Sequence, residues 1–161
     1  MSANNLFDIT GKKAIVTGGT RGLGYGMAEG LMEAGCEVAI IGTSAKVHDV
    51  AKGFCDRGFK CHGVVADLGK REGVYQGFKD CVAALGNDLD ILVTAHGIQR
   101  RHSAEVFPVE EWDEVINVKL EESMEVERRQ VRQRIRTPVH ERAESQPEGY
   151  RYIWCFGSLS G

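Results

Sequence analysis

Long apolar runs are absent from this chain of 161 residues. No stretch approaches the roughly 18 apolar residues that a membrane-spanning helix needs. The polar residues 1–5 lack the basic and apolar regions of a signal peptide. The formal net charge of −3 provides no basic field for nucleic acid or an anionic membrane. We therefore expect a cytoplasmic protein that binds neither a membrane nor nucleic acid.

Cysteine pairs with metal-ligand spacing are also absent. The five cysteines are odd in number and scattered, and none forms a Cys-x-x-Cys pair. They are Cys36, Cys55, Cys61, Cys81 and Cys155. This pattern predicts no zinc site and no disulfide framework, and we expect reduced, mostly buried thiols. With 42% hydrophobic residues, the chain is long enough for one domain with its own core.

Strand and helix signals alternate along residues 12–97. Short, β-branched and nearly uncharged segments are typical of a sheet buried on both faces. They occupy residues 13–17, 37–42, 61–66 and 89–95. Helical segments lie at residues 22–34, 46–57 and 70–85. Gly35 and Gly58 stand where helix C-terminal caps are expected. The alternation predicts an α/β fold with a doubly wound, parallel, Rossmann-like sheet.

A glycine-rich run joins the first predicted strand to the first predicted helix. It reads Thr17-Gly18-Gly19-Thr20-Arg21-Gly22-Leu23-Gly24. Its spaced glycines allow a sharp turn and a close approach of the backbone to a pyrophosphate. The helix that follows directs its positive end and free N–H groups at that phosphate. The run therefore predicts a dinucleotide site, against the alternative of a tight turn without a ligand.

The composition changes after a predicted helix at residues 109–120. No lysine follows Lys119, and residues 121–148 contain no glycine and are rich in glutamate, arginine and glutamine. Residues 150–156 again have the pattern of a strand. The sequence thus predicts a dinucleotide-binding domain over 1–120, a polar arm over 121–149 that is helical or disordered, and a fifth strand within 150–161.

The spacing Thr-Gly-x-x-x-Gly-x-Gly resembles the short-chain dehydrogenase/reductase family. Other segments match over residues 6–120: Leu6–Lys12, Asp67-Leu68, Thr94-Ala95-His96-Gly97 in place of Asn-Asn-Ala-Gly, and Trp112–Val118. The resemblance implies hydride transfer between a nicotinamide cofactor and a secondary alcohol or ketone as the small-molecule substrate. It implies no nucleic-acid partner, and the sequence leaves the oligomeric state open.

The resemblance also implies which residues hold NAD(P). They are Gly18, Thr20, Arg21, Gly22, Leu23, Gly24, Thr43, Ser44, Asp67, Leu68, Ala95 and Gly97. No acid follows the second strand to bind a ribose 2′-hydroxyl, whereas the Thr43 and Ser44 hydroxyls and the Arg21 guanidinium suit a 2′-phosphate. This local chemistry favours NADP. His96 stands where the family has alanine beside the nicotinamide ribose, as a titrating group or as an accommodated side chain.

Within the family, Gly26–Leu31 with Ala34–Cys36, and Gly97–Arg101, are most similar to sugar-acid dehydrogenases, such as 2-deoxy-D-gluconate 3-dehydrogenase and gluconate 5-dehydrogenase. This similarity implies that Arg100 or Arg101 pairs with a substrate carboxylate. The alternative is two solvated arginines in a loop. The sugar-acid similarity favours NAD rather than NADP, so the cofactor preference stays open.

The catalytic residues of the family are where this sequence departs from the pattern. The family uses a tyrosine as proton donor or acceptor, and a lysine four residues later lowers the pKa of its phenol. No Tyr-x-x-x-Lys exists here, and the position of the family's asparagine is Lys119. Only the family's serine has a candidate, Ser158. We therefore expect little dehydrogenase activity; the alternatives are a non-catalytic NAD(P)-binding or regulatory protein and a non-functional, truncated fragment.

The polar residues 121–149 also depart from the family, which has an apolar helix there. Such a change of composition suggests a frame shift, a mis-spliced exon or a truncated product. An arginine-rich arm that binds RNA or a partner is the functional alternative. Acidic residues balance the arginines, so this stretch has no net basic field, which favours a solvated or disordered segment.

Overall fold

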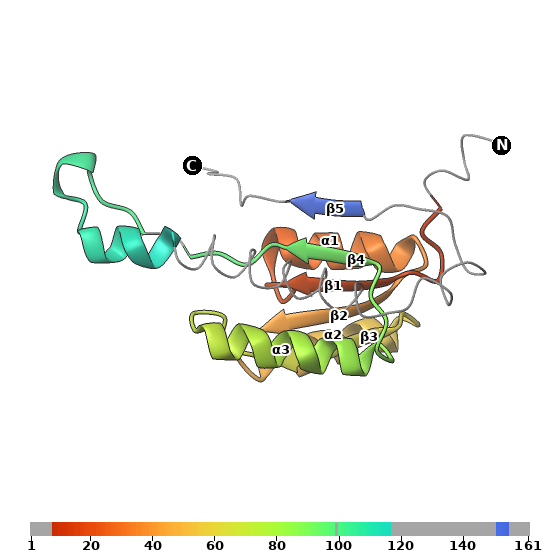
Figure 1. The fold of residues 1–161 in the computed structure, drawn as a ribbon. Coiled ribbons are helices and arrows are strands. Elements are labelled where there is room, and N and C mark those ends of the chain that lie inside the picture. Colours follow the sequence, from red (N-terminus) through yellow and green to blue (C-terminus); the bar gives the residue numbers. More distant parts are fainter. Residues whose placement is uncertain (1–7, 99, 117–150, 155–161) are drawn as a thin grey trace.

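A computed structural model describes residues 8–98, 100–116 and 151–154. Five parallel strands form one sheet in the order β3-β2-β1-β4-β5 (Figure 1). Their bounds are Lys13–Thr17 (β1), Glu37–Gly42 (β2), Cys61–Val65 (β3), Ile91–Thr94 (β4) and Arg151–Trp154 (β5). β5 lies within the segment where the sequence predicts a fifth strand. Ser158, Lys119 and the predicted arm, residues 121–149, lie outside the described residues.

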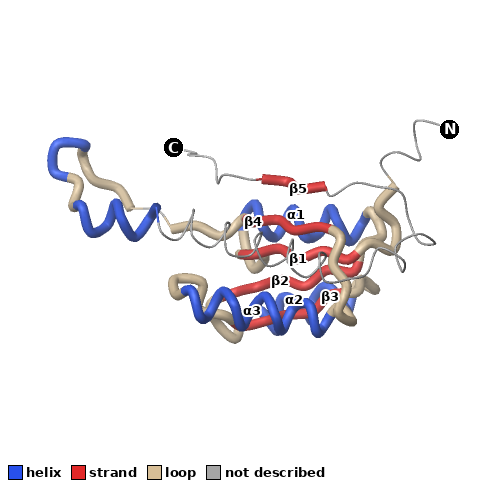
Figure 2. The backbone as a smooth tube through the Cα atoms, viewed as in Figure 1, coloured by secondary structure: helices blue, strands red, loops and turns tan. Residues whose placement is uncertain are grey.

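Three long helices cover the two faces of the sheet. They are α1 (Gly22–Glu33), α2 (Lys46–Asp56) and α3 (Arg71–Ala84). Helices α1 and α2 pack on one face against a cluster that includes Val16, Val38 and Val93. Helix α3 packs on the other face with Ile15, Ile41 and Leu92 (Figure 2). Apolar side chains of successive strand residues alternate between these two layers, which confirms the doubly wound α/β fold.

The predicted helix ends are confirmed by the backbone. Gly35 and Gly58 follow α1 and α2 with φ angles of +88° and +90°. Only glycine adopts this left-handed conformation without strain, so each glycine ends its helix as a C-terminal cap. The described part of the fourth predicted helix, residues 109–116, is also helical.

The prediction that every strand is buried on both faces is wrong for β3. This strand is the edge of the sheet, and only its first residue, Cys61, is buried. Val65 at its end is 44% exposed. A β-branched segment is expected to lie inside a sheet, but strand order depends on the whole chain and cannot be read from the strand's own composition.

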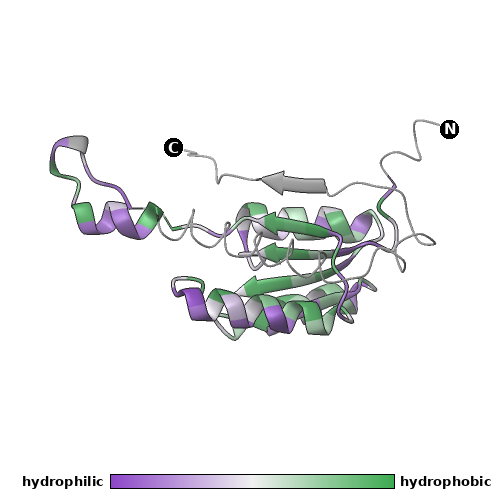
Figure 3. Ribbon diagram, in the orientation of Figure 1, coloured by the Kyte–Doolittle hydropathy of each residue, from purple (hydrophilic) through white to green (hydrophobic). Residues whose placement is uncertain are grey.

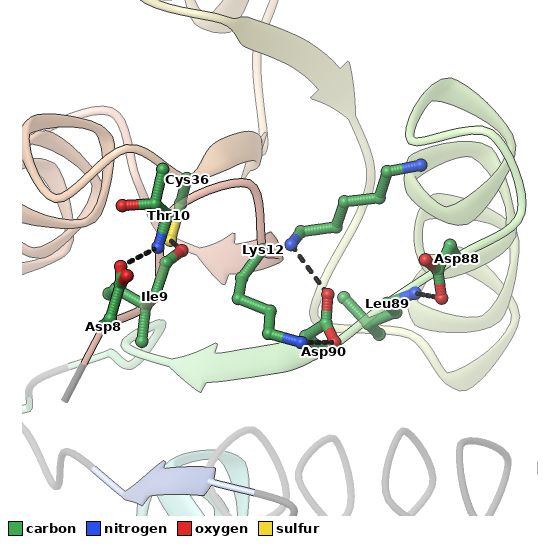
Figure 4. A network of polar contacts seen from close by, with 9 residues as sticks. Asp8, Ile9, Thr10, Lys12, Cys36, Asp88, Leu89 and Asp90 are labelled. Carbon is green, nitrogen blue, oxygen red and sulfur yellow. Dashed lines mark hydrogen bonds and ion pairs between the residues drawn. The ribbon is translucent and has the colours of Figure 1, made fainter. Parts of the chain in front are cut away.

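A polar network joins the amino ends of β1, β2 and β4 (Figure 4). The carboxylate of Asp90 accepts hydrogen bonds from Lys12 Nζ at 3.2 Å and from the Lys13 N–H at 3.0 Å. The thiol of Cys36 donates to the carbonyl of Ile9 at 3.3 Å. These contacts hold the starts of the three strands together, at the end of the sheet opposite to its carboxyl edge.

The cysteines are free thiols in the described part of the chain. Cys36, Cys61 and Cys81 are buried and Cys55 is exposed. Burial raises the pKa of Cys61 and of Cys81 to about 12. Over the described ranges, the structure contains no group of side chains that would hold a metal ion. Within the same ranges, no helix is long and apolar enough to cross a membrane.

Residues 100–116 form a lobe beyond the carboxyl ends of the strands (Figure 1). It contains a loop, the 3₁₀-helix η2 (Ala104–Val106) and the helical residues 109–116. Pro108 precedes the helix, and its carbonyl accepts the N–H of Trp112 at 3.1 Å. Proline fits this position because its fixed φ angle suits the first helical turn.

Candidate functional site

Four segments that the sequence singles out meet at the carboxyl edge of the sheet. They follow β1, β2, β3 and β4, which are parallel and in register, with Thr17 paired to both Ile41 and Thr94. The chain leaves β1 toward β2 on one side, whereas β4 lies on its other side. Ligands of open α/β sheets bind in the crevice at such a switch point, outside the carboxyl ends of the strands. The fold therefore brings the predicted cofactor residues from four separate segments to one edge.

The backbone of the glycine loop lies against the segment after β4. Gly18 has a φ angle of +68°, and a Cβ built there would lie 3.0 Å from His96 Cα and 3.3 Å from the Ala95 carbonyl oxygen. Its N–H donates to the Ile41 carbonyl at 2.9 Å. Both the backbone angle and the close approach require glycine at this position.

The turn into α1 is equally tight. A Cβ on Gly24 would overlap the Gly18 carbonyl oxygen and lie 2.9 Å from its carbon. Gly22 has a φ angle of +56° and Leu23 is 59% exposed. The N-cap residue, Arg21, is extended, makes no side-chain capping bond, and is followed by no acid in the first turn. The first N–H groups of α1 thus keep their hydrogen-bonding capacity for an anion.

Thr17 is a site residue that the sequence did not single out as an individual. Its side chain is buried, and its Oγ1 accepts hydrogen bonds from the N–H of Ala95 at 3.1 Å and of His96 at 3.2 Å. One hydroxyl therefore joins the end of β1 to the segment after β4. A threonine directly before the glycines was the available signal, but its partners lie 78 and 79 residues away.

The end of β2 presents hydroxyl groups and no carboxylate. Thr43 and Ser44 are exposed directly after Gly42. A Cβ on Gly42 would lie 2.7 Å from Thr20 Cγ2, so Thr20 of the glycine loop packs on this position. Arg21 is exposed in the same loop. The hydroxyl and guanidinium groups that suit a phosphate thus come from two neighbouring segments.

Asp67 and Leu68 are the second and third residues after β3. Leu68 is 1% exposed and belongs to the core on the α3 side. The carboxylate of Asp67 accepts from the Gly69 N–H at 3.1 Å and pairs with Lys70 Nζ at 3.0 Å. The pKa of the Asp67 carboxyl is lowered, first by the hydrogen bond with Lys70 and then by that with Gly69. Lys70 is a neighbour that the sequence analysis missed.

The segment after β4 contains Ala95, His96 and Gly97. Ala95 and His96 are half-buried and Gly97 is exposed. Nδ1 of His96 is buried, so part of this imidazole faces the interior rather than solvent. The structure therefore accommodates a histidine at the position where the sequence pattern has alanine.

The two candidate substrate arginines are exposed at the start of the lobe. Arg100 pairs with Glu114 at 3.0 Å and with Glu111 at 3.5 Å. The exposed guanidinium is thus paired with two carboxylates on the helix that follows. The acids lie 11 and 14 residues further on, where sequence spacing alone does not indicate a partner.

The comparisons with known proteins identify the family of this fold. The sequence model of the short chain dehydrogenases matches residues 12–136. Gluconate 5-dehydrogenase of Gluconobacter oxydans is 38% identical over 121 residues, covering 73% of this chain and 46% of the relative. 2-Dehydro-3-deoxy-D-gluconate 5-dehydrogenase of Escherichia coli is 36% identical over 116 residues, with 72% and 45% covered.

One solved structure has a similar fold. It is a gluconate 5-dehydrogenase from Burkholderia cenocepacia in complex with NADP and tartrate, similar with a TM-score of 0.74 and 32% identity. The match covers 83% of this chain and 52% of that chain. The chain thus spans about half the length of the relatives that it matches.

Proposed function

Because the chain belongs to the short-chain dehydrogenase family, we propose that it binds NAD(P) at the carboxyl edge of its sheet. The observation that supports this most directly is the glycine loop, where Gly18 and Gly24 allow backbone contacts that a Cβ would prevent. Because no side chain caps the start of α1, its first N–H groups are available to a phosphate. Residues 1–120 form the cofactor-binding unit of this proposal.

The proposal assigns each part of the edge to one part of the dinucleotide. The N–H groups at the start of α1 and the glycine loop would hold the pyrophosphate. Asp67 would hold the adenine side, where Leu68 has its side chain in the core and could contribute only through its backbone, and Ala95 and Gly97 would hold the nicotinamide side. The chemistry supplied by a bound nicotinamide cofactor is hydride transfer. The chain's own contribution is to bind and orient that group.

We propose a sugar acid as the substrate class, with hydride transfer at a secondary alcohol or ketone. The relatives named for gluconate and deoxygluconate support this proposal. Arg100 and Arg101 are the proposed partners of the substrate carboxylate. Glu111 contacts Nε and Glu114 contacts Nη2 of Arg100, so a substrate carboxylate would share the guanidinium with these two acids or displace one of them.

Cofactor binding without turnover is the result that we expect for this chain by itself. Its sequence contains no Tyr-x-x-x-Lys, so no phenol is paired with the lysine that makes it a usable acid or base near neutral pH. Fluorescence titration with NADPH and NADH should show saturable binding, and gluconate should not be oxidised. Oxidation of gluconate would contradict the prediction that this chain is catalytically impaired. A failure to bind either cofactor would contradict the proposed cofactor site. Binding without turnover is also the result expected for the alternative function, a non-catalytic NAD(P)-binding protein.

Selectivity for NADPH over NADH is expected from the hydroxyl groups after β2. A Thr43→Asp variant should bind NADPH about 10-fold more weakly, because a carboxylate repels a 2′-phosphate and instead accepts the 2′-hydroxyl of NADH. The asparagine of Thr43→Asn has nearly the same shape as aspartate without its charge, so the NADPH affinity of this control variant should change less than about threefold. Equal NADPH affinities of the two variants would exclude a 2′-phosphate at this position.

A further inference from the structure

The lobe of residues 100–116 is braced from within. Arg100 pairs with Glu111 and Glu114, and His102 Nε2 lies 3.0 Å from Glu111 Oε2. The ring of Phe107 stacks edge-on with His102 on one side and with Trp112 on the other, at centroid distances of 5.2 and 6.0 Å. These contacts give the lobe a defined shape although it projects beyond the sheet (Figure 1).

The lobe exposes three large apolar side chains. Val106 and Val109 are each 68% exposed and Trp112 is 58% exposed. Val109 and Trp112 are three residues apart in a helix and so lie on the same side of it. In the described part of the chain, only two other large apolar side chains are exposed, and both lie outside the lobe. Figure 3 shows hydrophobic and hydrophilic residues mixed along the ribbon of the lobe. A group of exposed apolar side chains of this kind is typical of an interaction surface.

The rim of this face is acidic. Glu105, Glu110 and Asp113 are exposed and adjoin the apolar residues in the sequence. Among the described residues, no ion pair neutralises any of these three, whereas Glu111 and Glu114 are already paired to Arg100. Residues 103–116 contain no lysine, arginine or histidine. The lobe's basic side chains, Arg100, Arg101 and His102, all lie at its start, whereas its five carboxylates outnumber them and three of these adjoin the apolar residues.

We propose that the face formed by Val106, Val109 and Trp112 binds a basic amphipathic helix of a partner protein. An apolar stripe on that helix would cover the indole and the two valines, and its lysine or arginine side chains would pair with Glu105, Glu110 and Asp113. Charge complementarity selects this partner, because an acidic helix or a second acidic face of the same kind would be repelled. Trp112 is the expected centre of the interface, since a half-exposed indole loses most contact with water on docking.

The test uses the full chain and a synthetic helical peptide of about 18 residues, with leucine every three or four positions on one face and arginine on the other. Fluorescence anisotropy of the labelled peptide should report saturable binding that weakens with salt. Trp112→Ser should weaken binding at least about 10-fold. The double variant V106S/V109S should also weaken binding at least about 10-fold. It keeps the edge-on contact of Trp112 with Phe107, so a loss of binding would report the loss of the apolar surface and not unfolding of the lobe.

Charge variants test the acidic rim. E110Q/D113N should weaken peptide binding about threefold to 10-fold and reduce its salt dependence. The matched control E33Q/D56N removes two exposed carboxylates from the ends of α1 and α2 and should leave binding unchanged. A peptide with glutamate in place of arginine should not bind. Equal binding by wild type, W112S and V106S/V109S would overturn the proposal. So would self-association of the free chain that W112S abolishes in sedimentation, because the face would then be covered by a second copy.

Discussion

Replacing Gly24 by alanine is expected to weaken NADPH binding about 100-fold and to lower the free energy of unfolding by about 1–3 kcal/mol. The added methyl group would meet the carbonyl group of Gly18, which is backbone and does not rotate away. The loop has to open to admit it. The phosphate cradle loses its shape in the same movement, so stability and cofactor affinity should fall together.

The control for this prediction lies in the same helix. Gly30 is exposed, and a Cβ built on it meets nothing within 4 Å. Gly30→Ala should raise the free energy of unfolding by up to about 1 kcal/mol, because alanine is the better helix former, and leave NADPH affinity unchanged. Fluorescence titration and urea denaturation of both variants measure the two effects. If G24A binds NADPH as tightly as G30A, the glycine loop is not the phosphate site.

A Thr17→Val variant is expected to lower the free energy of unfolding by about 2–4 kcal/mol. Valine has the shape of threonine, but it cannot accept the N–H groups of Ala95 and His96. Each of these part-buried donors left without a partner costs about 1–3 kcal/mol. The segment after β4 should also lose its fixed position beside the glycine loop, so NADPH affinity should fall with stability.

Thr17→Ser separates the hydroxyl from the methyl group. Serine keeps the acceptor and loses one methyl, so about 1 kcal/mol of stability should be lost and most of the affinity retained. Amide hydrogen exchange at Ala95 and His96 should accelerate in T17V and not in T17S. Equal stability of the two variants would mean that water replaces the threonine hydroxyl, and that Thr17 does not position the site.

The helix and strand bounds were largely predictable because local features set them. The prediction of strands at 13–17 and 37–42 is confirmed residue for residue, and the three long helices differ from their predicted bounds by one residue at most ends. β-Branched runs, glycine caps and apolar periodicity act over a few neighbouring residues. The family resemblance rests on the same kind of short, spaced motif, and the family match confirms it.

The segments that meet at the candidate site were predictable from the sequence, but their contacts were not. The glycine run, Asp67 and the segment after β4 were singled out by their positions after strands, and parallel pairing then places them at one edge. The bond from Thr17 to Ala95 and the ion pair of Asp67 with Lys70 were missed. The edge position of β3 was missed as well, because strand order is a property of the whole sheet.

Glycine spacing and apolar periodicity act locally, so the sequence was enough to establish an α/β protein with a glycine-rich turn between its first strand and first helix. Only the tertiary structure shows which distant segments contact the glycine turn and the lobe. Gly18 must be glycine because the segment after β4 passes against it, and Arg100 is held because a later helix returns two carboxylates to it. These contacts join residues far apart in the chain, so only the register of the folded sheet and the packing of the lobe establish them.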